Sequence, residues 1–176
     1  DIWECQTCET QVSLPFPSSE TLSKAYQNFN AGEFSRSSFE ELAEISVRIV
    51  KEDLSSAGIM DPSGLRVLDY GCGGGHFLKA ASQIGMAAVG LEVDAEDVAF
   101  AQSHALDVRM LDIGFPQNAL SANEKFDIVY INHVLEHVSA PSELVGTLLR
   151  RLVPGGILVV RTPDQSSVPA KIKIFL

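Results

Sequence analysis

Residues 65–77 constrain the fold of this chain more than any other segment, and they read Leu-Arg-Val-Leu-Asp-Tyr-Gly-Cys-Gly-Gly-Gly-His-Phe. An apolar run typical of a buried strand ends at Asp69, and a helix is predicted to begin near His76. Four of the five residues from 71 to 75 are glycines, so a ligand can approach the backbone of this turn closely. A strand, a glycine-rich turn and a helix in this order predict a ligand site at the carboxyl end of an open α/β sheet.

After this turn the sequence alternates between short β-rich runs and helical stretches. Such alternation predicts βαβ units and a parallel sheet that is covered on both faces. The predicted strands are residues 65–70, 87–92, 108–111, 126–131 and 157–161, and the predicted helices are residues 76–84, 95–105 and 141–152.

A further helix is predicted upstream of the sheet, from Ser37 to about Ser56. Ser37 and Glu40 have the spacing of a capping box with Ser37 as the N-cap, and Gly58 is the expected terminator. The residues before position 35 mix a cysteine pair, prolines and polar residues with little periodicity, which predicts irregular structure.

The charge and composition exclude several classes of protein. The chain has 13 Lys and Arg against 23 Asp and Glu, and its net charge of −10 disfavours a nucleic-acid partner. Its uninterrupted apolar stretches are only a few residues long, too short to span a membrane. Three cysteines cannot form a disulfide framework, which predicts a reducing, cytoplasmic compartment. Because residue 1 is Asp rather than Met, we expect the chain to be part of a longer protein.

The glycine spacing bears on which nucleotide the turn can hold. The dinucleotide fingerprint needs a third small residue three positions after its second glycine. Counted from Gly71 and Gly73, that position is His76, whose side chain would obstruct a pyrophosphate at the start of the helix. Glu92 lies 21 residues after Gly71, where its two carboxylate oxygens can bind both hydroxyls of a ribose. Asp94 is instead expected to be the N-cap of the following helix.

The motifs of the chain, in their order, resemble those of class I S-adenosylmethionine-dependent methyltransferases. The resemblance rests on the glycine turn after Asp69, the strand end at Glu92, and three further segments: Val-Arg-Met-Leu-Asp-Ile at 108–113, Phe-Asp-Ile-Val-Tyr-Ile-Asn-His-Val-Leu-Glu-His at 126–137, and Leu-Val-Pro-Gly-Gly-Ile-Leu-Val-Val-Arg-Thr-Pro at 152–163. It implies an α/β fold with a Rossmann-like doubly wound parallel sheet, the class I methyltransferase fold, lacking its last strands in this chain.

The amino-terminal part resembles one bacterial branch of this family, similar to methyltransferases of types 11 and 23, on residues Trp3, Cys5, Cys8, Pro15, Pro17, Leu22 and Tyr26. In that branch a small zinc ribbon precedes the catalytic domain, and Cys5 and Cys8 match the second of its two cysteine pairs. We therefore expect no metal in this chain unless an upstream cysteine pair exists. The implied division is an irregular segment with half a zinc ribbon (1–35), a lead-in helix (36–60) and a carboxyl-terminally incomplete cofactor-binding domain (61–176).

The resemblance implies an enzyme that transfers a methyl group from S-adenosyl-L-methionine to a small-molecule or sugar-type acceptor. Glu92 would hold the ribose hydroxyls of this cofactor, and Asp112 with Ile113 would hold its adenine. The full set of implied cofactor-binding residues is Asp69, Tyr70, Gly71, Cys72, Gly73, Gly75, Glu92, Val93, Asp112, Ile113, Asn132 and His133. The identity of the acceptor, the choice among O-, N- and C-methylation and the oligomeric state stay open.

His133 is the candidate catalytic residue, because it follows the fourth predicted strand where side chains can face the site. Its neutral imidazole can accept a proton from the acceptor near physiological pH. His137 is the weaker candidate, and Cys72 is expected to be a small packing residue rather than a nucleophile. Two other functions stay open, a nicotinamide-dependent Rossmann oxidoreductase and a non-catalytic nucleoside-binding module with the same fold.

Overall fold

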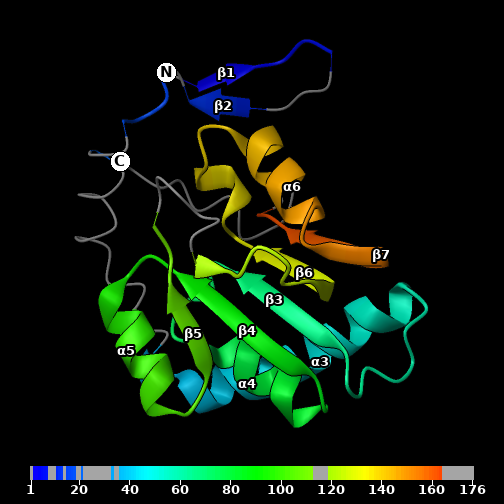
Figure 1. Cartoon of the computed structure of the whole chain (residues 1–176). Coiled ribbons are helices and arrows are strands. Elements are labelled where there is room, and N and C mark those ends of the chain that lie inside the picture. Colours follow the sequence, from blue (N-terminus) through cyan, green and yellow to red (C-terminus); the bar gives the residue numbers. More distant parts are fainter. Residues whose placement is uncertain are drawn as a thin grey trace.

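The structure is a computed structural model of the chain, and it describes residues 2–7, 11–13, 15–18, 21, 33, 36–112 and 119–163. Its centre is a parallel five-stranded sheet of order β5-β4-β3-β6-β7 (Figure 1). The strands are β3 (Arg66–Tyr70), β4 (Ala87–Glu92), β5 (Asp107–Met110), β6 (Phe126–Asn132) and β7 (Leu152–Arg161). The predicted α/β fold with a doubly wound parallel sheet is confirmed.

The order of the strands reverses between β3 and β6. From β3 the chain adds β4 and then β5 on one side, and it returns to place β6 against the other side of β3. In open α/β sheets, ligands bind at such a switch point, outside the carboxyl ends of the strands. The topology therefore marks the ends of β3 and β6 as the centre of a candidate site.

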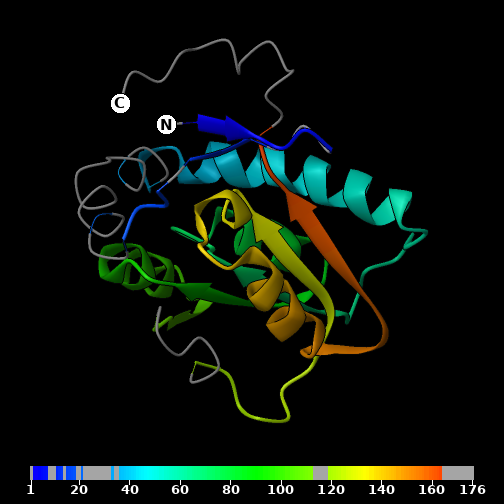
Figure 2. The same ribbon diagram turned by 90° about the horizontal axis from the view of Figure 1, so that it is seen from above.

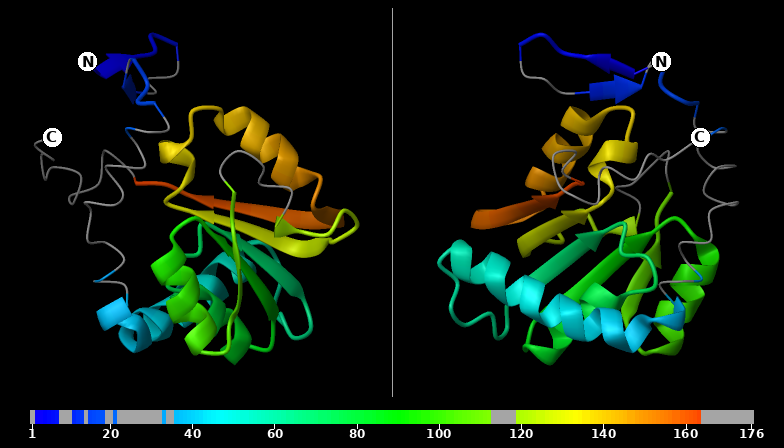
Figure 3. Two further views of the ribbon diagram at one scale, coloured as in Figure 1. Left: turned by 60° about the vertical axis from the view of Figure 1, so that its left-hand side comes forward. Right: turned by 180° about the vertical axis from the view of Figure 1, so that it is seen from behind.

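Helices cover both faces of the sheet (Figure 3). Three helices lie on one face, α3 (Phe39–Ser56), α4 (His76–Gln83) and α5 (Ala95–Ser103), whereas α6 (Pro141–Leu149) lies on the other. Among the described residues, no helix is long and apolar enough to cross a membrane.

Strand β6 explains why its segment is a nearly continuous apolar run. Ile128 and Tyr130 belong to the core on the side of α3, α4 and α5, whereas Val129 and Ile131 belong to the core on the side of α6. All four side chains have no exposed surface. A strand between two helical layers is buried on both faces, which favours an unbroken apolar sequence over alternation.

Helix α3 runs past α5 towards the carboxyl end of β7 (Figure 2). The predicted capping box at its start is wrong: Ser38, not Ser37, is the N-cap, and its side chain makes no capping hydrogen bond. Glu40 instead forms an ion pair with Lys79 of α4, so tertiary pairing replaces the local cap. The predicted end is confirmed, because Gly58 has a φ of +81° and the Ile59 N–H donates to the Leu54 carbonyl at 2.8 Å.

The boundary between α6 and β7 differs from the prediction of a helix to residue 152 and a strand from residue 157. The helix ends at Leu149 and the strand begins at Leu152, so the Pro-Gly-Gly segment lies within β7. The β6–β7 register is irregular here, because Phe126 pairs with Leu152 whereas Ile128 pairs with Ile157. The extra residues form a bulge, which Gly155 permits through its φ of +80°.

Other boundaries differ by small amounts, and among the strands β3 begins at Arg66 and β5 runs from Asp107 to Met110. Helix α4 ends at Gln83, and α5 ends at Ser103 rather than residue 105, because Ala105 takes a left-handed φ of +58° that no helix continues. In the segment predicted to be irregular, β1 (Ile2–Glu4) and β2 (Gln11–Ser13) pair as an antiparallel two-stranded sheet.

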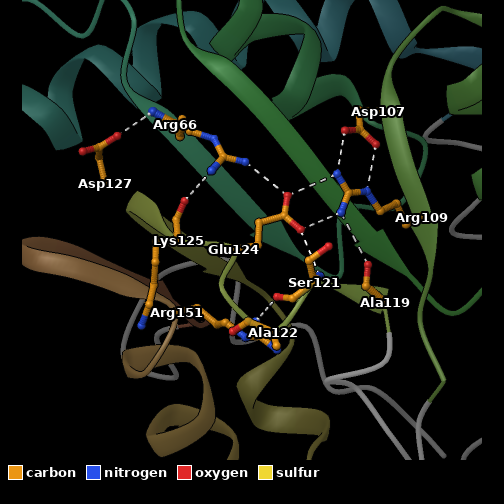
Figure 4. Close-up of polar contacts among 10 residues, drawn as sticks. All are labelled: Arg66, Asp107, Arg109, Ala119, Ser121, Ala122, Glu124, Lys125, Asp127 and Arg151. Carbon is orange, nitrogen blue, oxygen red and sulfur yellow. Dashed lines mark hydrogen bonds and ion pairs between the residues drawn. The ribbon is translucent and has the colours of Figure 1, made fainter.

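An ion-pair network fixes the amino-terminal edge of the sheet, opposite the candidate site (Figure 4). Glu124 accepts hydrogen bonds from Arg109 of β5 at 2.9 Å and from Arg66 of β3 at 3.1 Å. The Arg109 guanidinium holds the pKa of Glu124 below its usual range. Arg151 also donates to the Ser121 carbonyl at 2.6 Å. These contacts tie the segment before β6 to β3, to β5 and to Arg151, the residue before β7.

Candidate functional site

The predicted site residues gather at the carboxyl ends of four strands. Asp69 and Tyr70 end β3, Glu92 ends β4, and Asn132 ends β6. Asp112 follows β5 and is exposed. Ile113 lies outside the described residues. Tyr70 is buried in the core on the α6 side, and Val93 is exposed.

The glycine turn owes its shape to left-handed backbone conformations. Gly71, Gly73 and Gly75 have φ angles of +78°, +52° and +86°. A Cβ at Gly71 would lie 2.4 Å from a Val134 methyl, so a side chain is excluded there. Among the described residues, a Cβ at Gly73 would have one neighbour within 4 Å, Asp97 Oδ2 at 4.0 Å. The turn is thus packed at Gly71 and open at Gly73, where a ligand can approach the backbone.

Cys72 packs the glycine turn against Gly90 of β4. Its side chain is 3% exposed, and its Sγ would lie 2.5 Å from a Cβ at Gly90 of β4. Burial raises the pKa of the Cys72 thiol far above its usual range, and the charges of Asp69, Glu92 and Asp97 add to this shift. The thiol therefore stays protonated, which suits packing rather than nucleophilic chemistry.

Glu92 is anchored by three backbone donors. Its Oε2 accepts a hydrogen bond from the Gly73 N–H at 2.7 Å, and its Oε1 accepts from Val93 at 2.6 Å and Asp94 at 3.0 Å. Burial raises the pKa of this carboxyl, and the three N–H donors oppose the shift. Asp94 is the N-cap of α5, as predicted, because its side chain accepts from the N–H groups of Glu96 and Asp97.

Asp69 lies at the centre of the switch point and is 2% exposed. The Asn132 side-chain amide approaches its Oδ1 at 3.4 Å, across the β3–β6 pair. Burial raises the pKa of Asp69 to about 7, and the charge of Glu92 adds to the rise while Asn132 opposes it. Near pH 7 this carboxyl is therefore only partly ionised, and a cation or a hydrogen-bond donor in the site would favour its charged form.

Asp97 borders the glycine turn, although it is not among the residues that the sequence predicts for the site. It is 7% exposed, and its Oδ1 accepts a hydrogen bond from Arg36 Nη1 at 2.6 Å. Arg36 also bonds Glu96 at 3.1 Å. In the sequence, Asp97 comes three residues after an N-cap, where an acidic residue stabilises a helix on its own account. Helix stabilisation is therefore enough to explain an acidic residue at position 97. The sequence around it does not show that its side chain lies beside the glycine turn.

Three buried carboxyls, those of Asp69, Glu92 and Asp97, thus surround the glycine turn. His76, the first residue of α4, brings no compensating positive charge, because burial lowers the pKa of its imidazole. Phosphate-binding glycine turns present N–H groups and positive potential to an anion. The charges of this turn instead suit a ligand that carries positive charge and hydroxyl donors.

His133 follows the last residue of β6 in a left-handed conformation, with a φ of +52°. The strand extends one residue beyond the predicted end, because Asn132 pairs with Arg161 of β7. The His133 N–H donates to the Arg161 carbonyl at 2.8 Å, and the Arg161 side chain bonds Asp53 of α3 at 2.8 Å. This arrangement holds a non-glycine residue in a strained backbone conformation, a feature common at functional sites.

The His133 side chain is exposed and lies beside Glu136. Its Nδ1 is 3.6 Å from Glu136 Oε1, and His137 Nε2 is 4.0 Å from the same oxygen. His133 thus stands at the carboxyl end of β6, one residue beyond Asn132.

Residues 36–173 match a family model described as a methyltransferase domain. The chain belongs to this family. S-adenosylmethionine is the cofactor of its class I members, so the predicted methyltransferase resemblance and cofactor are confirmed at the level of the family.

Individual relatives agree with this assignment. A ubiquinone biosynthesis O-methyltransferase of Caulobacter sp. (strain K31) is 33% identical over 108 residues, which are 58% of this chain and 42% of that protein. This chain thus spans less than half of the length of that relative. An S-adenosylmethionine-dependent methyltransferase from Mesorhizobium loti has a TM-score of 0.53 and 26% identity, over 64% of this chain and 53% of its own. The [4+2]-cyclase SpnF has a TM-score of 0.52 and 26% identity, over 68% of this chain and 47% of its own.

The predicted cysteine pair lies outside the residues that match the family model. Cys5 is exposed and directly follows β1, whereas Cys8 lies outside the described residues. Within the described ranges, no three His, Cys, Asp or Glu side chains are grouped to hold a metal ion. Two cysteines do not complete the four-ligand shell of a structural zinc site.

Proposed function

We propose that this chain is the cofactor-binding part of an S-adenosylmethionine-dependent methyltransferase that acts on a small-molecule or sugar-type acceptor. The observation that carries the proposal is the buried carboxyl cluster around an open glycine turn. S-adenosylmethionine offers what this cluster lacks, a sulfonium and an ammonium cation together with two ribose hydroxyls. When bound, it supplies a methyl group on a sulfur that leaves as a neutral thioether.

Each residue of the site has a proposed task in holding this cofactor. Gly73 gives the ligand access to the backbone, and Glu92 accepts from the ribose. Asp69 faces the methionine side, and Asp112, which follows β5, accepts from the adenine. Because methyl transfer is a direct displacement, the remaining task of the protein is to align the acceptor and remove its proton.

We propose a hydroxyl as the acceptor group, with His133 as the base that takes its proton. The support is the strained backbone of His133 at a strand end and its approach to Glu136. The O-methyltransferase relatives favour a hydroxyl over an amine or carbon acceptor. A cytoplasmic location stays a prediction from the cysteine content.

The alternatives make different demands on the turn. A nicotinamide cofactor would bring a pyrophosphate beside three carboxyls, which repel it, and the family match also disfavours this function. The second candidate function is a reaction other than methyl transfer on the same fold. The similarity to SpnF, which is described as a [4+2]-cyclase, supports it.

Calorimetry on the full-length protein tests the proposed cofactor. We expect S-adenosylhomocysteine to bind and NADH not to bind, and Glu92→Ala to weaken S-adenosylhomocysteine binding because the ribose loses a charge-assisted hydrogen bond. Acceptor panels with a labelled methyl group then test transfer. NADH binding with no response to S-adenosylhomocysteine would refute the proposal, whereas binding without transfer to any acceptor would favour the second candidate.

We further propose that Cys5 and Cys8 are half of a zinc ribbon that an upstream cysteine pair completes. The antiparallel pairing of β1 with β2 on either side of these cysteines supports this. We expect elemental analysis to find no stoichiometric zinc in this chain alone and one zinc per chain after an upstream pair is included. One zinc in the short chain would contradict the proposal.

A further inference from the structure

Glu92 is short of hydrogen-bonding capacity for the role that the sequence predicts for it. A carboxylate offers roughly four lone-pair sites. Three of them already accept backbone N–H groups, two at Oε1 and one at Oε2. One site therefore remains, whereas a ribose presents two hydroxyl donors. A second acceptor beside Glu92 is needed if both hydroxyls are to be bound.

Asp97 provides a second acceptor at the same glycine. The N–H of Gly73 donates to Glu92, and a Cβ built on Gly73 would lie 4.0 Å from Asp97 Oδ2. The two carboxylates thus border one residue of the turn, and the charge of Asp97 also raises the pKa of Glu92. Hydrogen bonds to the Asp97 carboxylate among the described residues go to Oδ1, from Arg36 at 2.6 Å.

Arg36 fixes the direction of this carboxylate. Its guanidinium bridges Asp97 and Glu96, so it holds Oδ1 and leaves Oδ2 facing Gly73. Asp97 is 7% exposed. A carboxylate buried to this extent lowers the stability of the fold unless hydrogen bonds and opposite charges compensate for its lost hydration. The pairing uses only one of its two oxygens.

We propose that Asp97 is a specificity-determining residue of the cofactor site, which accepts one ribose hydroxyl through Oδ2 while Glu92 accepts the other. Arg36 is the positioning residue of this pair. The inference rests on the proposed function. It has a chemical consequence, because two carboxylates at the ribose edge also exclude a ribose that carries a phosphate ester.

A ligand-based double-mutant cycle tests this assignment. The ligands are S-adenosylhomocysteine and its 2′-deoxy and 3′-deoxy analogues, measured by calorimetry on the full-length wild type and on Asp97→Ala. In the wild type we expect each deoxy analogue to bind about 10-fold more weakly than the parent, because each lacks one charge-assisted hydrogen bond. In Asp97→Ala the parent should weaken about 10-fold or more, and one deoxy analogue should then bind as tightly as the parent.

Glu44→Gln is the control, because it neutralises an exposed carboxylate on α3 and leaves Arg36, Glu96 and Asp97 in place. It should change none of the three affinities. If Asp97→Ala does not fold, Asp97→Asn, which keeps the side-chain shape, replaces it. In Asp97→Asn the difference in affinity between S-adenosylhomocysteine and the same deoxy analogue should be smaller than in the wild type.

The outcomes separate this inference from the function on which it rests. If Asp97→Ala weakens all three ligands by one factor, or none, Asp97 does not read a hydroxyl and the assignment is wrong while the cofactor stands. If the wild type does not bind S-adenosylhomocysteine, the proposed function fails and this assignment fails with it.

Discussion

Replacing Asp69 by Asn should make the protein more stable at neutral pH. Burial raises the pKa of Asp69 from 3.8 to about 7, so folding disfavours the charged form. Below pH 3.8 the carboxyl is protonated in the folded and unfolded states alike. As pH rises from about 4 to about 7, the unfolded chain releases this proton first, and the folded state loses stability relative to it.

The size of the effect follows from the shift of roughly 3 pKa units, each of which is worth about 1.4 kcal/mol. By pH 8 the charged carboxyl should therefore cost about 4 kcal/mol of stability, of which about 3 kcal/mol is lost between pH 5 and pH 8. Asn has the same shape, and its carbonyl can accept from Asn132 as the carboxylate does. Asp69→Asn should remove the loss and be about 4 kcal/mol more stable than the wild type at pH 8.

Urea unfolding at pH 5 and pH 8 measures this difference directly. Glu44→Gln is the control, because it neutralises an exposed carboxyl on α3 and should change the free energy of unfolding by no more than about 0.5 kcal/mol. The same Asp69→Asn variant should bind S-adenosylhomocysteine more weakly, since the site loses charge facing the ligand's ammonium group. The reasoning is refuted if Asp69→Asn is no more stable than the wild type at pH 8.

Two other changes test the turn and the strand end. Gly71→Ala should lower stability by about 2–5 kcal/mol in thermal unfolding, because it combines a left-handed φ with a clash between the new methyl group and Val134. The control Gly58→Ala has a similar φ and no such clash, so it should cost only about 1 kcal/mol. Equal losses of stability in the two variants would contradict the clash. His133→Ala should lower turnover roughly 10²–10⁴-fold and leave S-adenosylhomocysteine affinity nearly unchanged, whereas His137→Ala should mainly lower stability. Unchanged turnover in His133→Ala would show that His133 is not the base.

The predicted positions of the site residues came from local patterns. Glu92 and Asn132 end buried strands, and parallel strands bring their carboxyl ends to one edge of a sheet. Asp94 was predicted as an N-cap because its oxygen reaches N–H groups only two and three residues away. Such features depend on neighbours within a few residues, so they are readable without the fold.

Two of the predictions that failed depend on residues far away in the sequence. Ser37 and Glu40 have the spacing of a capping box, but Glu40 pairs with Lys79, which lies 39 residues later. The Pro-Gly-Gly segment has the composition of a turn, yet it continues β7 as a bulge because β6 supplies partners on either side of it. In both cases a tertiary contact competes with the local preference and prevails.

By itself, the sequence determined that the chain forms an α/β sheet with a glycine turn and carboxylates at the strand ends, because helix and strand periodicity and glycine backbone freedom are local properties. Only the tertiary structure decided what those carboxylates can still bind. Three backbone N–H groups occupy most of Glu92, and Arg36, which is 61 residues from Asp97, turns a second carboxylate towards Gly73. Hydrogen-bonding capacity depends on every donor that reaches an oxygen, and the packing of distant elements sets those donors.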